Sequence, residues 1–182
     1  MRVTVFGGSS PRPGEPAYIA AQHLGELLGA AGHTVLSGGY TGTMEAVSRG
    51  ANRAGGHVIG VTSDEIESWR PGGANRWVQE EMRFKTQRQR LFGLIENCDA
   101  ALVLPGGIGT LAELAEMWSH MQTGAISPRP LILIGPGWKS VIETFFAVLD
   151  GYVPEQSRKL LDFAEDVDAA FAKLNAKVGD TL

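Results

Sequence analysis

The chain has 182 residues, with 16 Lys and Arg against 20 Asp and Glu, so its formal net charge is −4 and its sequence pI is about 5.6. This balance disfavours a broad nucleic-acid-binding surface, and any bound phosphate must be held locally. The single cysteine, Cys98, excludes an internal disulfide and a thiolate metal cluster. We expect one cytoplasmic domain over 1–182, without a signal peptide, a membrane span, a metal or another cofactor.

Short apolar runs alternate with segments of helical periodicity along the chain. Strands are predicted at residues 3–6, 33–37, 57–61, 102–104 and 130–135. Helices are predicted at about 16–30, 46–51, 83–97, from 111 onward, 138–149 and 166–177, with a turn and short helix over 152–161. Residues 62–75 show no clear period and are interpreted as a mobile loop that lies over the ligand site. The alternation predicts an α/β fold, a Rossmann-like doubly wound parallel sheet flanked by helices, which binds ligands at the carboxyl ends of its strands.

Two glycine-rich loops near the N-terminus are candidate nucleotide contacts. In the first loop, Gly8, Ser9 and Ser10 follow a strand, and the two hydroxyls either donate to a phosphate or ribose or act as cap and turn residues. The second loop spans 38–45 and opens a helix. Its candidate contacts are Gly39, Gly42 and Thr43, whereas Tyr40 and Glu45 suit either a base and a sugar hydroxyl or the protein surface.

The third glycine loop carries the strongest signal, because it joins a buried strand directly to a helix. Its residues are Gly106, Gly107, Ile108, Gly109 and Thr110. The first N–H groups of a helix lack intrahelical partners and carry partial positive charge, so this loop is interpreted as a phosphate cradle. Glu113, one turn later, either stabilises the helix dipole or reaches whatever is attached to the phosphate.

Residues 105–113, PGGIGTLAE, resemble the PGGxGTxxE signature of the Lonely Guy (LOG) family, often labelled lysine decarboxylase-like. The similarity extends from Val5 to about Leu149 and includes a (C/G)GSS loop at 7–10 and a GGGxxGxMG-like segment at 38–45, where Tyr40 and Glu45 replace glycines. The resemblance implies a homodimer that hydrolyses the N-glycosidic bond of a nucleoside 5′-monophosphate, either AMP or a cytokinin-type nucleotide, to free base and ribose 5-phosphate.

The same resemblance implies a catalytic pair, Arg90 and Glu113. Arg90 lies fifteen residues before Pro105, where the family has the arginine of its RK motif. Leu91 stands in place of the motif's lysine, so one cation of the family's site is absent. Ser119 keeps a hydroxyl where the family has a ligand-contacting threonine.

Several neighbouring residues are candidates for secondary roles. Gln87 replaces a family methionine, and Arg88 or Lys85 are possible substitutes for the missing lysine. Other residues whose role is open between ligand contact and ordinary packing or solvent exposure are Trp69, Trp77, Glu116 and His120.

Cleavage of an N-ribosidic bond develops positive charge on the sugar, which a fixed carboxylate stabilises. We assign this role to Glu113, together with orientation of the attacking water. Arg90 would assist electrostatically or hold the carboxylate or phosphate, because its high pKa does not suit proton donation.

Three other functions are alternatives to hydrolysis. Pyridoxal-dependent decarboxylation requires a Schiff-base lysine, and the three glycine loops contain none. A nucleotide or molybdenum-cofactor carrier shares the glycine-loop architecture and is compatible with Leu91. Binding of single-stranded DNA would need a basic groove, which the acidic composition disfavours. The predicted ligand is therefore a nucleoside monophosphate, without nucleic-acid or membrane partners.

Overall fold

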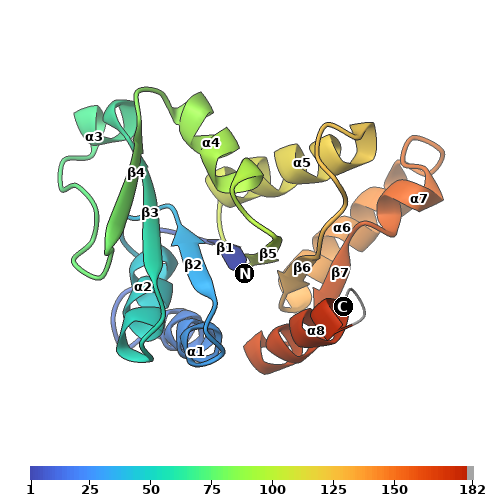
Figure 1. The fold of residues 1–182 in the computed structure, drawn as a ribbon. Helices are drawn as coiled ribbons and strands as arrows, with labels where there is room; N and C mark the ends of the chain where they lie inside the picture. Colours follow the sequence, from blue (N-terminus) through green and yellow to red (C-terminus); the bar gives the residue numbers. More distant parts are fainter. Residues whose placement is uncertain (180–182) are drawn as a thin grey trace.

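The computed structural model describes residues 1–179, which form a seven-stranded sheet flanked by helices (Figure 1). The strands are β1 (Arg2–Phe6), β2 (Thr34–Ser37), β3 (Val58–Ser63), β4 (Glu80–Phe84), β5 (Ala100–Val103), β6 (Leu131–Ile134) and β7 (Asp162–Ala164). The helices are α1 (Pro16–Ala30), α2 (Thr43–Arg53), α3 (Asp64–Trp69), α4 (Gln87–Glu96), α5 (Ile108–Thr123), α6 (Pro136–Val148), α7 (Glu155–Arg158) and α8 (Val167–Gly179).

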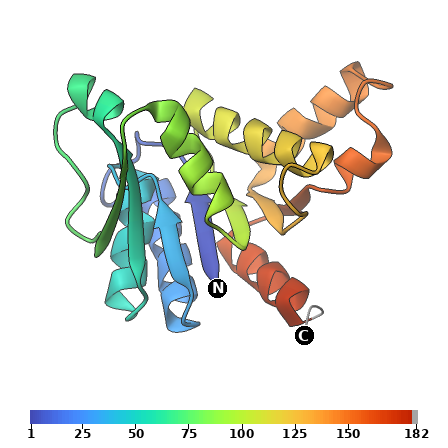
Figure 2. The same cartoon turned by 45° about the horizontal axis from the view of Figure 1, so that its top comes forward.

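Helices cover both faces of the sheet, as the doubly wound prediction requires (Figures 1 and 2). Side chains of α1, α2 and α8 form one apolar layer with the sheet, and those of α4, α5 and α6 form the other. Strands buried on both faces need apolar residues at successive positions, which explains the continuous runs in β5 and β6.

The strand order places the switch point of the sheet between β1 and β5. The order is β4-β3-β2-β1-β5-β6-β7, and every neighbouring pair is parallel. The chain winds outward from β1 to β4 and then returns to β5, beside β1. The helices that follow these two strands therefore diverge to opposite faces and leave a crevice at the carboxyl ends, where this class of sheet binds its ligands.

The predicted helix over 83–97 is wrong at its start. Residues 80–84 form β4, which pairs in parallel with β3, and the helix begins at Gln87. Thr86 caps it: its hydroxyl accepts from the N–H of Gln89, and the Gln89 side chain accepts from the N–H of Thr86. Arg83 consequently lies on β4, before the helix that carries Arg90.

The predicted loop over 62–75 is also wrong in its first half. Residues 62–63 continue β3, and α3 follows with Ser63 as its N-cap and acidic residues in its first turn. Irregular structure begins only at Arg70. The edge strand β7 was not predicted, because its three residues are too few to show a period. The predicted short helix within 152–161 is confirmed as α7.

Candidate functional site

The loops that follow β1 and β5 are bonded to each other and to the start of α2. The N–H of Gly8 donates to the carbonyl of Pro105 at 3.2 Å, and the carbonyl of Gly8 accepts from both the N–H and the hydroxyl of Thr43, each at 2.9 Å. Gly42 has φ +72°, and a Cβ there would lie 2.5 Å from the carbonyl carbon of Ser9. Gly42 and Thr43 therefore fix the shape of the first loop.

The N-terminus of α5 faces the crevice without a side-chain cap. Gly107 is the N-cap residue, so the N–H groups of Ile108, Gly109 and Thr110 are the first three of the helix and have no partner within it. Gly106 packs against Thr110, since a Cβ at Gly106 would lie 2.1 Å from the threonine hydroxyl. This close packing presents backbone donors, which suit an anion, at the crevice.

A cavity of about 430 Å³ occupies this end of the sheet, within the range of about 300–1,000 Å³ common for small-molecule sites. The predicted site residues that line it are Gly8, Ser9, Ser10, Arg90, Gly107, Ile108, Gly109, Thr110 and Glu113. Those that do not line it are Gly39, Gly42, Thr43, Gly106 and Ser119. Gly39, Gly42, Thr43 and Gly106 shape the surrounding loops, whereas Ser119 is exposed further along α5.

Arg90 and Glu113 meet at the floor of the cavity. The Arg90 side chain is 8% exposed and the Glu113 side chain 13%, and Nη1 of Arg90 lies 3.7 Å from Oε1 of Glu113. Two backbone carbonyls fix the guanidinium: Nε donates to Val61 of β3 at 2.7 Å, and Nη2 donates to Gly38, just after β2, at 3.2 Å. Arg90 therefore presents Nη1 toward the carboxylate.

Burial raises the pKa of Glu113 from 4.5 to about 7, and the positive charge of Arg90 opposes this rise. Burial lowers the pKa of Arg90, and the charge of Glu113 opposes that change in turn. An arginine with so high an ordinary pKa stays charged, so the group that titrates near neutrality is the carboxyl of Glu113. A carboxyl with this pKa can accept or donate a proton at neutral pH.

The cavity has an apolar wall, for which the sequence suggested Tyr40 and Trp69 as possible ligand contacts but not Met44 or Ile66. Ile66 and Trp69 of α3, together with Tyr40 and Met44, line the side opposite the phosphate loop. Tyr40 is buried: its hydroxyl donates to the carbonyl of Ser63 at 3.3 Å and accepts from the N–H of Ser63 at 2.9 Å. Trp69 is 69% exposed at the rim. The N-cap residue Ser63 and the acidic residues that follow it are the sequence signals that would have indicated the helix in place of the predicted loop.

Arg70, Gln87 and Gly38 were also outside the predicted site. Arg70 lines the cavity and donates through Nη2 to the hydroxyl of Thr41 at 2.6 Å, and Gln87 lines it from the first turn of α4. Gly38 leaves room for Arg90, because a Cβ at Gly38 would lie 2.0 Å from Nη2.

Of the secondary candidates, Trp69 and Gln87 line the cavity, whereas Trp77, Glu116 and His120 do not. Leu91 packs against the apolar layer formed by α4, α5 and α6, and neither Arg88 nor Lys85 lines the cavity. Besides Arg90, the cationic side chain in the lining is Arg70. Glu116 and His120 pair with each other at 3.2 Å, and the His120 ring stacks on Phe92. Glu45 is half-buried but does not line the cavity.

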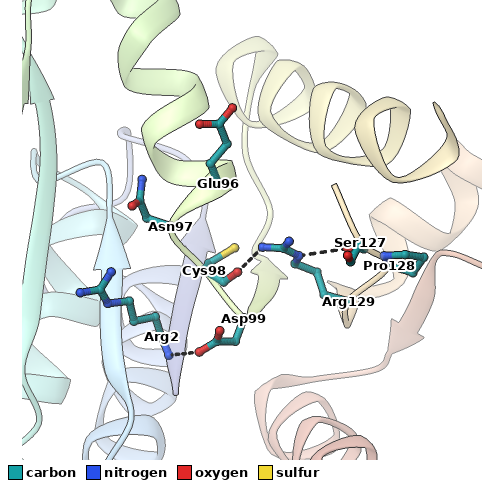
Figure 3. A pocket seen from close by; sticks show the side chains of 8 residues that line it. All are labelled: Arg2, Glu96, Asn97, Cys98, Asp99, Ser127, Pro128 and Arg129. Atoms are coloured by element: carbon teal, nitrogen blue, oxygen red, sulfur yellow. Dashed lines mark hydrogen bonds between the residues drawn. The ribbon is translucent and has the colours of Figure 1, made fainter. Parts of the chain in front are cut away.

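A second hollow, of about 490 Å³, lies at the opposite end of the sheet (Figure 3). Its polar groups bond mainly to the local backbone: Arg129 donates to the carbonyls of Cys98 and Ser127, and Asp99 accepts from the N–H of Arg2 at 2.7 Å. Cys98 is buried and free. This hollow lies at the amino ends of the strands, away from the glycine loops.

Within residues 1–179, no cluster of three or more His, Cys, Asp or Glu side chains is placed to hold a metal ion. No helix of that part of the chain is both long and apolar enough to cross a bilayer. A pyridoxal cofactor also lacks its attachment residue, because no described residue lining the cavity is a lysine.

Comparison with known proteins relates the chain to one enzyme family. Residues 44–174 match the model of a family described as possible lysine decarboxylase. The chain is 33% identical to a protein of Oryza sativa subsp. japonica named as a probable cytokinin riboside 5′-monophosphate phosphoribohydrolase, over 97% of this chain and 78% of that protein. It is 32% identical to a cytokinin riboside 5′-monophosphate phosphoribohydrolase of Arabidopsis thaliana, over 96% and 77%.

Among solved structures, a molybdenum cofactor binding protein from Rippkaea orientalis has a similar fold. The TM-score is 0.76, the sequence identity is 22%, and the alignment covers 97% of this chain and 96% of that one. At this identity the similarity establishes the Rossmann-like architecture alone.

Proposed function

Because the chain belongs to the family described as possible lysine decarboxylase, together with the phosphoribohydrolases of rice and Arabidopsis, we propose that it is a nucleoside 5′-monophosphate phosphoribohydrolase. Water would cleave the N-glycosidic bond of AMP or a cytokinin-type riboside monophosphate. The products would be the free base and ribose 5-phosphate.

The observation that carries the proposal is the pairing of Glu113 with Arg90 in the cavity that also contains the open N-terminus of α5. A phosphate at the N–H groups of residues 108–110 would place the attached ribose near the next turn of the helix, where Glu113 lies. The ribose would then stand next to the carboxylate that its developing positive charge requires.

The reaction requires one proton acceptor and one stabilised leaving group. As the bond between C1′ and the base nitrogen breaks, its electron pair leaves with the base, and a water oxygen bonds to C1′. The carboxylate of Glu113 stabilises the sugar cation and accepts one proton from the attacking water. The departing base takes up one proton from solvent and leaves as a neutral molecule, and Glu113 returns its proton to solvent, which restores the carboxylate. Arg90 keeps part of the Glu113 population ionised near neutral pH, since its charge lowers the pKa of that carboxyl.

The family's decarboxylase description does not fit these residues. Decarboxylation of an amino acid through pyridoxal phosphate requires a lysine for the Schiff base, and the cavity lining offers none among the described residues. Hydrolysis of a glycosidic bond needs a carboxylate and a water molecule, and Glu113 supplies the carboxylate.

Incubation of the chain with AMP, followed by chromatography for free adenine and ribose 5-phosphate, tests the proposal directly. Equal amounts of the two products are expected from the wild type, with little from Glu113→Gln. A rise in melting temperature with AMP but no free base from the wild type would instead support a nucleotide carrier and overturn the hydrolase assignment.

We further propose that the active form is a homodimer. Most of the exposed large apolar side chains lie on α5, on α6 and just after α6: Ile108, Leu111, Val141, Phe145, Val148, Leu149 and Tyr152. We call this set the apolar face. Ile108 is 86% exposed and also lines the cavity, so a second copy that covered the apolar face would border the site.

A further inference from the structure

Three arginines surround one tryptophan at a place separate from the cavity. The guanidinium carbons of Arg49, Arg53 and Arg76 lie 5.8, 5.5 and 4.8 Å from the centroid of the Trp77 ring. Arg49 and Arg53 are one turn apart on α2, whereas Arg76 and Trp77 belong to the segment 70–79, which joins α3 to β4. We call these four residues the arginine cluster. None of them lines the cavity.

The arginine cluster concentrates positive charge that the described part of the chain does not balance. Arg83, seven residues after Arg76, is bonded to Asp64 and Glu67 at 2.7 and 2.9 Å. Within residues 1–179, by contrast, the guanidinium groups of the arginine cluster form neither an ion pair nor a hydrogen bond. Glu45 lies one helical turn before Arg49, yet the two form no ion pair. In a chain of net charge −4, three adjacent unpaired cations are unexpected.

Two hydrogen-bond donors in the arginine cluster are buried without an acceptor. They are Nε of Arg49 and Nε1 of Trp77. Buried donors in folded proteins are nearly always paired, because an unpaired donor retains the full cost of its lost hydration. Both groups donate only, so the partner that they lack must be an acceptor.

We propose that the arginine cluster binds a phosphate group, either free or carried by a small molecule. A guanidinium matches the oxygens of a phosphate through two parallel hydrogen bonds, and three of them favour an anion with more than one negative charge. Contact with the indole stabilises the arginines but neutralises no charge and supplies no acceptor for the two buried donors. The site does not depend on the proposed hydrolysis, because the cavity contains none of these residues.

Calorimetric titration of the full chain with inorganic phosphate, pyrophosphate and ribose 5-phosphate at physiological ionic strength tests this site. Arg49→Gln/Arg53→Gln removes two of the three cations and is expected to weaken one binding site about tenfold or more. Arg88→Gln is the matched control, since Arg88 is a single guanidinium 5.8 Å from the Phe92 ring. Tighter binding of ribose 5-phosphate than of phosphate would assign the ligand to a phosphorylated molecule, and equal binding would assign it to the free ion.

Arg76→Gln provides a second test that does not depend on helix packing. Arg76 is exposed in an irregular segment, so its replacement leaves the fold intact, and about threefold weaker binding is expected. Wild-type affinity and stoichiometry in both the double variant and Arg76→Gln would overturn the proposal. So would an equal loss of affinity in Arg88→Gln, because binding would then follow net charge alone.

Discussion

Burial of Glu113 opposes the ionisation of its carboxyl group, and the positive charge of Arg90 only partly offsets this effect. The carboxyl is nearly buried and has a single charged neighbour, 3.7 Å away. Its pKa of about 7 leaves it divided between both protonation states at neutral pH, whereas an exposed glutamate would be almost wholly ionised. A carboxylate that has lost most of its hydration also interacts more strongly with a developing cation.

Replacement of Glu113 by Gln is expected to reduce the rate of base release from AMP by about 10²–10⁴, because an amide neither stabilises the sugar cation nor accepts a proton. Nucleotide binding should survive and can be followed as a rise in melting temperature. Glu116→Gln is the matched control: Glu116 lies on the same helix but does not line the cavity. Equal rates in the two variants would remove Glu113 from the chemistry.

The pH dependence of the reaction should report the ionisation of Glu113. The ionised carboxylate is the active form, so kcat/KM is expected to rise with pH, reach half its maximum near pH 7 and level off above it. In Arg90→Gln the midpoint should move to higher pH, because the cation that favours ionisation is gone. Steady-state rates from pH 5 to 9 measure both midpoints, with Arg88→Gln as the control. A midpoint in Arg90→Gln at or below the wild-type value would contradict this account of Arg90.

At the scale of elements, strands between two helical layers were predictable because their apolar runs are continuous. The start of α4 was not predictable, because polar and apolar residues alternate only weakly over 80–84. This segment forms a strand by pairing with β3. The capping box at Thr86 and Gln89 is visible in the sequence and marks the true start. The N-cap at Ser63 and the acidic first turn of α3 were likewise visible, but six residues are too few to show a helical period.

The contact between α1 and α2 depends on the absence of a side chain at Gly50. A Cβ there would lie 2.0 Å from the carbonyl oxygen of Gln22 and 2.8 Å from the backbone nitrogen of Glu26. Backbone cannot yield as a flexible side chain does, so Gly50→Ala must separate the helices, and a loss of about 1–3 kcal/mol in the free energy of unfolding is expected. Because α2 begins at Thr43, which holds the Gly8 loop, nucleotide binding should weaken as well.

Urea unfolding of the wild type and Gly50→Ala measures this loss, with Gly137→Ala as the control. Gly137 lies in α6, and a Cβ there would meet no heavy atom within 4 Å apart from those of its chain neighbours and of the adjacent helix backbone. Its replacement should therefore be neutral or stabilise by up to about 1 kcal/mol. Equal stability of the two variants would show that α1 and α2 can separate without cost.

At the scale of the whole molecule, the sheet brings together segments that are distant in sequence. The loops after β1 and β5 meet because these strands are neighbours at the switch point, which the alternation of strands and helices made predictable. Segment 62–75 was predicted to lie over the site, but as a loop, so the helix α3 that supplies Ile66 and Trp69 to the apolar wall was missed. Sequence patterns therefore indicated the phosphate loop, the position of Glu113 and the segment that faces them, but not the helical form of that segment.

The side chains of the apolar face are exposed to solvent in the single chain, which is why we propose that a second copy packs against them. Val141 and Val148, seven residues apart on α6, lie on one side of the helix and are 54% and 74% exposed. If a second copy covers them, Val141→Glu/Val148→Glu would place two charges in the interface and should yield monomers. Neither side chain is buried in the single chain, so the fold should persist.

Sedimentation or light scattering at micromolar concentration measures the assembly. The wild type is expected at twice the 19.4 kDa of one chain, and the double variant at 19.4 kDa. Ile19→Glu is the control, because Ile19 is 57% exposed on α1, outside the apolar face. If the partner chain borders the cavity at Ile108, the double variant should also release base from AMP more slowly than the wild type. A wild-type chain that sediments as a monomer would show that the apolar face has another role.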